Sequence, residues 1–210
     1  AALGVRDAGA SLGVEVALHV GTLLAVVAVY RRELLDLLGD ALSGRLRDPL
    51  LVVLGTLPVV VVGFLLGDQV EAAFASTRTA GLGLLGTAGI LAVGEWARRR
   101  HADIPVPADA GPLTVRIALL VGLAQAVAIL PGVSRSGSTI STALLLGVAP
   151  DRAARFSFLL SIPAILGAAL LMLPDARDEL AAGEVQLLPL LLASLLAGVV
   201  GWVALRIVLR

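Results

Sequence analysis

Leu130-Pro131-Gly132-Val133-Ser134-Arg135-Ser136-Gly137-Ser138-Thr139 is the segment that decides the fold, because it places polar residues between two long apolar stretches. Arg135 is the only formally charged residue between Arg116 and Asp151. A charge at membrane depth is costly unless it faces a cavity or a partner. The segment therefore predicts a functional site.

The residue types in this segment suit an anion. Four residues carry hydroxyl groups that can donate to it: Ser134, Ser136, Ser138 and Thr139. Arg135 can direct two donors at phosphate oxygens. Pro131 ends the incoming helix, and Gly132 and Gly137 let the backbone turn its N–H groups toward one point. We expect a helix that begins near Ser138 to add its positive end, so the segment predicts a phosphate site buried in a membrane.

The composition is that of a membrane protein. Of 210 residues, 58% are hydrophobic and 15% are charged, and the mean hydropathy is +0.98. A soluble domain of this size does not need so much apolar surface. The formal net charge is zero and all 16 basic residues are arginine, so no broad basic surface for nucleic acid is indicated. Cysteine is absent, which excludes disulfides and thiolate chemistry.

Apolar segments near spanning length recur along the chain. They are Gly9–Tyr30, Pro49–Gly67, Thr79–Trp96, Phe156–Leu173 and Val185–Leu205. Arginine-rich links alternate with arginine-poor links, as expected if the links are cytoplasmic and external in turn. The sequence therefore predicts an all-α, polytopic membrane helix bundle that forms a single domain over residues 1–210.

The central stretch Ile117–Pro150 is too long for one span and short for two. Each half would reach about 20–24 Å as a helix, whereas the hydrocarbon core is about 30 Å thick. We therefore predict a re-entrant helix–loop–helix over about residues 113–149, with the polar segment at its tip. The pairs of spans before and after it run in opposite orientations by the arginine count, which predicts inverted-topology repeats with a ligand at their interface.

The run GLAQAVAILPGVSRSGSTI at Gly122–Ile140 resembles the second signature of bacterial undecaprenyl-diphosphate phosphatases, the bacitracin-resistance family. Three further segments are similar to helices of that family: EVALHVGTLLAV at Glu15–Val26, LPVVVVG at Leu57–Gly63 and AARFSFLLSIPA at Ala153–Ala164. The loop motif is long and specific, and the resemblance covers nearly the whole chain.

The resemblance implies dephosphorylation of a C55 isoprenoid diphosphate to the monophosphate, which recycles the lipid carrier of cell-wall synthesis. It also implies a multi-pass protein of the bacterial plasma membrane, a site open to the external face, and assistance by a divalent metal, magnesium or calcium. The implied catalytic residues are Ser134, Arg135 and Thr139, and a hydroxyl among them would be either a donor or the nucleophile. The resemblance also implies that Ser136 and Gly137 shape the loop, and the predicted substrate-binding residues are Gly132, Ser136, Gly137, Ser138 and Gln125. The partners are the isoprenoid diphosphate lipid and the bilayer, and the oligomeric state is open between a monomer and a homodimer.

The chain departs from the family pattern at both ends. The family has an N-terminal half-site with two glutamates in E-x-x-x-E spacing, a Pro-Val-Ser-Ser run and a histidine, and nothing before Gly9 resembles it. One expected span is also missing at the C-terminus. Because Met172 is the only methionine, we expect a fragment or processed piece of an active parent. A polypeptide that consisted of these residues alone is expected not to catalyse.

The loop, several candidate site residues and the function also have alternative interpretations. Residues 131–139 could form a kinked helix hairpin whose hydroxyls bond to carbonyls of their own helix, although this leaves Arg135 unpaired. Glu15 and His19 lie four residues apart and could contact metal or substrate, or be polar groups satisfied between helices. Gln125 and Ser157 are expected to form interhelical hydrogen bonds and could border the cavity. The alternative function is a transporter or flippase of an anionic lipid or small anion.

Overall fold

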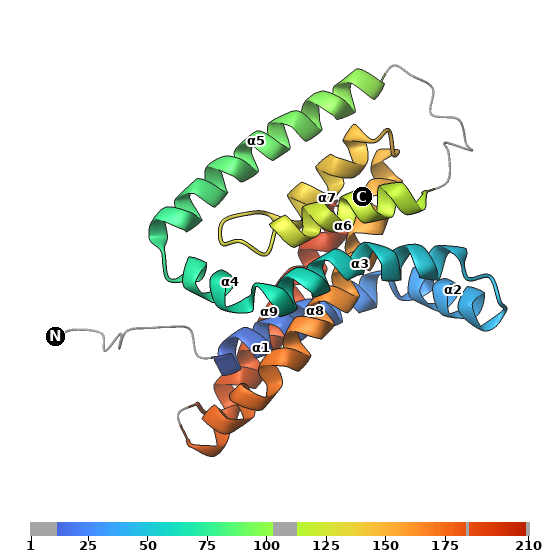
Figure 1. Ribbon diagram of the computed structural model, residues 1–210. Helices are drawn as coiled ribbons and strands as arrows, with labels where there is room; N and C mark the ends of the chain where they lie inside the picture. The colour runs from blue at the N-terminus through green and yellow to red at the C-terminus, as the bar shows by residue number, and fades with distance from the viewer. Residues whose placement is uncertain (1–11, 103–112, 184, 209–210) are drawn as a thin grey trace. The chain divides into compact units, whose positions relative to one another are not determined.

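The computed structural model of the chain describes residues 12–102, 113–183 and 185–208. In these ranges all regular secondary structure is helical (Figure 1). The helices are α1 (Leu12–Val29), α2 (Arg31–Leu42), α3 (Arg47–Leu65), α4 (Gly67–Phe74), α5 (Thr77–Ala102), α6 (Val115–Val127), α7 (Arg135–Leu145), α8 (Pro150–Ala181) and α9 (Leu187–Val208). The prediction of an all-α polytopic membrane protein is confirmed.

The predicted spans correspond to long apolar helices. Within the described residues, four helices can each cross a membrane by length and composition: α3, α5 over Thr77–Arg100, α8 and α9. The bent pair of α1 and α2 passes the same test together, with an angle of 77° between its two parts. Part of the predicted first span, residues 9–11, lies outside the described residues.

Several segments that were predicted as links are helical, among them residues 68–74 in α4. Residues 31–42 form α2, which has an exposed, charged surface, and α8 continues through Pro174 to Ala181 instead of ending at Leu173. The extension has the sequence Asp175-Ala-Arg-Asp-Glu-Leu-Ala181, which is rich in good helix formers. Apolar length therefore predicted where the spans lie, whereas helix propensity in the polar flanks set where the helices end.

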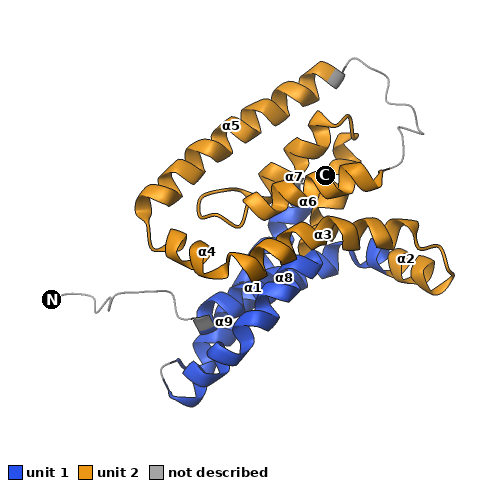
Figure 2. Ribbon diagram, viewed as in Figure 1, with its two compact units in different colours: residues 1–34, 162–210 blue, residues 35–161 orange. Residues whose placement is uncertain are grey.

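The chain forms two compact units (Figure 2). Unit 1 comprises residues 1–34 and 162–210, and unit 2 comprises residues 35–161. Helix α8 belongs to unit 2 up to Ser161 and to unit 1 from Ile162. The single membrane domain and the inverted repeats both stay predictions.

Unit 1 is built on the contact between α1 and α9. At Gly21 the backbones approach so closely that an added Cβ would overlap the carbonyl oxygen of Ser194. One turn further along, a Cβ at Gly201 would lie 3.2 Å from the Cβ of Ala25. Small residues bring membrane helices into van der Waals contact in this way. Large apolar side chains of α9 remain exposed, as lipid-facing groups are: Leu188, Leu191, Leu192, Leu195, Leu196 and Val200.

Unit 2 has a small hydrophobic core around α6. It contains Leu51, Ala97, Ala118, Val121, Ala143, Leu144, Ala153, Phe156 and Leu160. Helix α3 reaches α6 through Gly55 and Gly122, where a Cβ at Gly122 would overlap the Gly55 carbonyl oxygen. Leu160 is fully buried beside Gly55. This core holds α6 and α7 and thereby positions the polar segment between them.

Helices α6 and α7 form the predicted helix–loop–helix and pack against each other (Figure 1). Helix α6 has 13 residues and α7 has 11, which corresponds to about 20 Å and about 17 Å of helix. Each is too short to cross a hydrocarbon core of about 30 Å. Their lengths agree with a re-entrant hairpin, and its depth in the bilayer stays a prediction.

Candidate active site

The loop between α6 and α7 is centred on a tight turn over residues 130–133. The backbone N–H of Val133 donates to the carbonyl oxygen of Leu130 at 3.1 Å. Pro131 occupies the second position and Gly132 the third, with φ of +84° at the glycine. This is the pattern of a type II turn, in which only glycine adopts the third position without strain. The turn reverses the chain and directs it toward the start of α7.

Helix α5 contacts this turn backbone to backbone. A Cβ at Gly83 would overlap the carbonyl oxygen of Pro131, and a Cβ at Gly132 would overlap that of Ala80. Gly132 is therefore required twice, for its positive φ and for its lack of a side chain. Further along the same face of α5, Thr87 donates to the carbonyl oxygen of Gly132 at 2.7 Å and accepts from the N–H of Ser134 at 2.9 Å.

Thr87 is a site residue that sequence reasoning missed. Its hydroxyl lies within the apolar part of α5, a position at which threonine usually bonds to its own helix. A weak signal existed, because Gly83 and Thr87 lie four residues apart and share a helix face. Nothing in the sequence, however, connects that face to a loop 45 residues further on.

Helix α7 begins at Arg135, not near Ser138 as predicted. The reason is that Ser134 caps the helix: its Oγ accepts from the backbone N–H of Gly137 at 3.1 Å. Serine in extended conformation before the first helical residue is a favoured N-cap. The earlier start places Arg135 in the first turn of the helix, where the N–H groups point outward.

The guanidinium group of Arg135 is partly buried in unit 2. Among the described residues it makes no hydrogen bond or ion pair with a protein group. The backbone N–H groups of Arg135 and Ser136 likewise have no acceptor in the part of the chain that the structure describes. The side chain of Ser136 is exposed beside them. Together these donors form a group that suits an anion such as phosphate.

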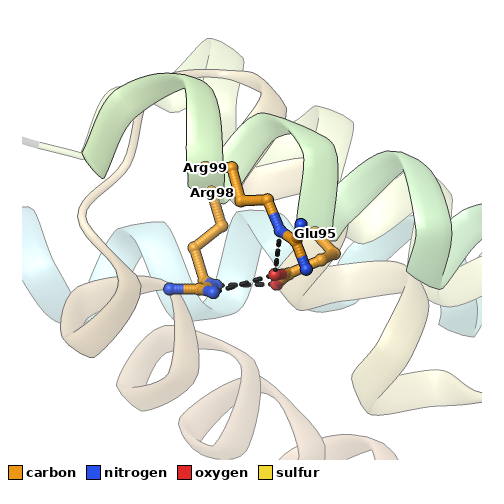
Figure 3. Close-up of polar contacts among 3 residues, drawn as sticks. All are labelled: Glu95, Arg98 and Arg99. Carbon is orange, nitrogen blue, oxygen red and sulfur yellow. Dashed lines mark hydrogen bonds and ion pairs between the residues drawn. The ribbon is translucent and has the colours of Figure 1, made fainter. Parts of the chain in front are cut away.

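The arginines at the end of α5 differ from Arg135. Arg98 donates to both carboxylate oxygens of Glu95, at 2.7 and 2.8 Å, and Arg99 donates to the same carboxylate at 2.7 Å (Figure 3). Arg100 lies over the ring of Trp96 at 5.1 Å. These arginines are exposed, and each interacts with a carboxylate or an aromatic ring of its own helix. Arginines are common at the end of a membrane span.

Thr139 lies in the next turn of α7 and is buried, with 1% of its surface exposed. Its Oγ1 donates to the carbonyl oxygen of Arg135 at 2.9 Å and lies 2.6 Å from the Oγ of Ser157 in α8. Ser157 thus forms the interhelical hydrogen bond that its position in an apolar span predicts. Because the proton of Thr139 is bonded to a carbonyl oxygen, this hydroxyl is poorly placed to attack a phosphate.

Three further predicted residues lie within the hairpin helices and are buried. Gly137 is buried, and a Cβ there would lie 2.9 Å from the Oγ of Ser134 and 3.1 Å from Leu91. Ser138 and Gln125 are 3% and 1% exposed, and their side-chain polar atoms have no partner among the described residues. Buried groups of this kind are usually satisfied by water or a ligand. Gln125 therefore does not form the interhelical hydrogen bond that we expected of it.

Glu15 and His19 lie in α1, which belongs to unit 1. The Nδ1 of His19 lies 2.8 Å from the carbonyl oxygen of Glu15, so the ring is held by the backbone of its own helix. This contact does not involve the Glu15 carboxylate. A role for either residue at the site stays a prediction.

The described residues do not fit a divalent metal by themselves. Nowhere in the described ranges do three side chains of His, Cys, Asp or Glu come together as a metal site would require. The loop offers hydroxyl, N–H and guanidinium groups, and magnesium and calcium prefer carboxylate and carbonyl oxygens.

Comparison with known proteins identifies the family. The family model described as "Bacitracin resistance protein BacA" matches residues 1–210. The chain belongs to this family. Because the match extends over the whole chain, both the α1–α9 pair and the hairpin fall within the BacA region.

The chain is also similar to individual proteins that are named undecaprenyl-diphosphatase. The undecaprenyl-diphosphatase of Geobacter sulfurreducens is 38% identical over 218 residues, and that of Chlorobium phaeobacteroides is 34% identical over 218 residues. Each alignment covers 99% of this chain and 77% of the relative. The undecaprenyl-diphosphatase of Korarchaeum cryptofilum is 44% identical over 162 residues, covering 71% of this chain and 58% of the relative. The aligned region thus spans between about three fifths and three quarters of these BacA-family proteins.

Proposed function

We propose that the chain carries the phosphate-binding part of an undecaprenyl-diphosphatase active site, and that the protein hydrolyses undecaprenyl diphosphate to undecaprenyl phosphate and inorganic phosphate. One observation carries the assignment of the site. The guanidinium of Arg135 stands at the start of α7 without a partner among the described residues, beside two unbonded backbone N–H groups. Membership of the BacA family supports the reaction.

The proposed binding mode follows from these donors. The terminal phosphate would accept from the guanidinium of Arg135, which can bond two oxygens at once. The N–H groups of Arg135 and Ser136 add the positive end of the α7 dipole. In a low-dielectric environment these fixed donors stabilise the charge that spreads over the phosphate oxygens in the transition state.

The reaction breaks the bond between the terminal phosphorus and the bridging oxygen. The oxygen of water becomes bonded to that phosphorus, and the two protons of water remain with the phosphate products. Ser134 would act either as a donor to a phosphate oxygen or as the nucleophile of a two-step route. Its Oγ accepts from Gly137 N–H and keeps its own proton for both roles. Acid quenching followed by mass spectrometry for phosphoserine at Ser134 distinguishes the two.

For Thr139 we propose a supporting role. Its hydroxyl joins the first turn of α7 to Ser157 and thereby holds the helix start that presents Arg135. Assistance by magnesium or calcium is a separate proposal, which rests on the family resemblance. Loss of phosphate release in chelator, with recovery on adding back one metal, would support it.

The central experiment measures phosphate release from a long-chain isoprenyl diphosphate by purified protein in detergent. Arg135→Ala is expected to lower turnover by about 100- to 1,000-fold, the usual effect of removing one donor to a developing charge. Arg206→Ala is the matched control, because this arginine lies over the ring of Trp202 in unit 1 and is expected to keep turnover within about twofold.

Unchanged release in Arg135→Ala would remove the proposed site. Movement of intact diphosphate lipid across vesicles without phosphate release would favour a flippase or transporter instead. The external orientation of the site is part of the same proposal. A membrane-impermeant substrate analogue that is cleaved only from the outer face would support it.

A further inference from the structure

Thr87 uses its hydroxyl differently from Thr56 and Thr22, two other threonines in apolar helices. Thr56 in α3 donates to the carbonyl oxygen of Val52 at 2.8 Å, and Thr22 in α1 donates to that of Leu18 at 2.9 Å. Both bonds stay within one helix, which is the ordinary behaviour of threonine there. Thr87 instead donates at 2.7 Å to Gly132, 45 residues further along the chain.

The same oxygen also accepts from the backbone N–H of Ser134 at 2.9 Å. One hydroxyl therefore satisfies a carbonyl and an N–H on the two sides of Val133. Irregular backbone has no helical partners of its own, and an unsatisfied backbone group is costly in a low-dielectric environment. Thr87 supplies the two bonds that this part of the loop would otherwise lack.

These bonds act on the start of α7. Ser134 is the N-cap of the helix, and Arg135 is its first residue. Fixing the N–H of Ser134 fixes the plane of the peptide that precedes the cap. The direction of the Ser134 hydroxyl and of the Arg135 side chain depends on that plane.

The backbone contact between α5 and the loop, one turn from Thr87, prevents the loop from compensating for a lost Thr87 hydroxyl. Gly83 of α5 already touches the loop at Pro131, and Gly132 of the loop touches α5 at Ala80. The loop therefore cannot move closer to α5 to compensate for a lost hydroxyl. Without Thr87, the carbonyl of Gly132 and the N–H of Ser134 must find other partners, which requires the loop to shift.

We propose that Thr87 is a positioning residue for phosphate hydrolysis: it holds residues 132–134 so that Ser134 and Arg135 face the terminal phosphate. This proposal rests on the proposed function. Thr87 itself touches neither the substrate nor the reacting atoms. It acts through the geometry of the loop.

The test compares Thr87→Val with Thr56→Val, each assayed for kcat and KM with a long-chain isoprenyl diphosphate. Both changes replace a hydroxyl with a methyl group in an apolar helix. We expect Thr87→Val to lower kcat by about 10- to 100-fold with a smaller change in KM, because a small misplacement of reacting groups costs up to about 100-fold. Thr56→Val is expected to stay within about twofold of the unaltered protein. Thr87→Ser retains the hydroxyl and is expected to recover most of the lost rate.

A second readout does not depend on catalysis. The sequence contains no cysteine, so Ser136→Cys introduces a single exposed site for a nitroxide spin label. Adding Thr87→Val should increase the mobility of the label, and adding Thr56→Val should not. If the unaltered protein releases no phosphate, the proposed function fails. The mobility of the label still tests whether Thr87 holds residues 132–134.

Two results would overturn the inference. One is a Thr87→Val protein with unaltered kcat and unaltered label mobility. The other is a Thr87→Ser protein as impaired as Thr87→Val, which would assign the effect to packing of the side chain and not to its hydroxyl.

Discussion

The α1–α9 contact in unit 1 and the α5–loop contact in unit 2 both depend on a glycine that lies against a backbone carbonyl, but the two contacts serve different purposes. In the first, Gly21 lies against the carbonyl oxygen of Ser194, and in the second, Gly83 lies against that of Pro131. Both glycines leave no room for a Cβ. In each case the close approach brings two backbones into direct van der Waals contact.

The difference lies in what the glycine approaches. Helices α1 and α9 are regular, so their own hydrogen bonds satisfy the backbone and the contact needs only small residues. The loop at residues 128–134 is irregular, and among the described residues the carbonyl of Gly132 and the N–H of Ser134 have no backbone partner. Unit 2 therefore adds a hydroxyl at Thr87 to the steric contact. Packing alone joins two spans, whereas a functional loop also needs hydrogen bonds from its neighbours.

Among the changes that test this comparison of the two units, the largest effect is expected when the loop glycine with positive φ is replaced. Gly132→Ala and Gly183→Ala both put alanine at positive φ, +84° and +73°. This strain costs about 1–2 kcal/mol at each site. Only at Gly132 does the new Cβ also meet backbone, since at Gly183 no described atom lies within 4 Å. We expect phosphate release to fall by about 100-fold for Gly132→Ala and to remain near normal for Gly183→Ala. Equal activity in the two variants would contradict the account of the turn.

The next effect separates stability from activity. Gly83→Ala and Gly21→Ala each force one backbone contact apart, so both should lower the melting temperature in detergent. Only Gly83→Ala should also lower the turnover of the protein that remains folded, because only that contact touches the loop. Gly86→Ala is a control on α5, where the structure describes no atom within 4 Å of the added Cβ. If Gly21→Ala also lowered the turnover of the protein that remains folded, the expected difference between the two regions would be contradicted.

A smaller effect is expected at the buried hydroxyl pair of unit 2. Thr139→Val leaves the hydroxyl of Ser157 without its partner and should destabilise the protein by about 1–3 kcal/mol. Thr22→Val in unit 1 removes bonds only to its own helix, at 2.9 and 3.1 Å, and should cost less. Chemical unfolding in detergent measures both. A double-mutant cycle of Thr139→Val with Ser157→Ala that proves additive would show that the pair contributes no coupling.

The smallest effect is expected at the compensated arginines of α5. Arg98→Ala leaves Glu95 with its second partner, Arg99, and all three side chains lie at the surface (Figure 3). Exposed ion pairs contribute little to stability. We expect the melting temperature and phosphate release to be nearly unchanged. A large loss of release would mean that an arginine outside the hairpin also acts on the substrate.

Much of the candidate site was predictable from Leu130–Thr139 alone. An isolated arginine among hydroxyl residues and glycines is a local pattern, and it indicated the loop that the structure shows and the anion binding that we propose for it. The start of α7 was predicted three residues late, because the capping bond from Ser134 competes with the flexibility of the glycines and only geometry shows which prevails. Thr139 was grouped with the reacting residues, whereas its bond to Arg135 indicates a supporting role.

The sequence by itself determined the class of protein, the position of the apolar helices and the polar segment for which we propose anion binding, because hydrophobic length and lone charges are properties of short stretches of chain. Only the tertiary structure decided which residues hold that segment. Thr87 meets Gly132 and Ser134 across 45 and 47 residues, and Thr139 meets Ser157 across 18. Such pairs arise when separate helices pack together, and no local pattern of hydrophobicity or spacing specifies them.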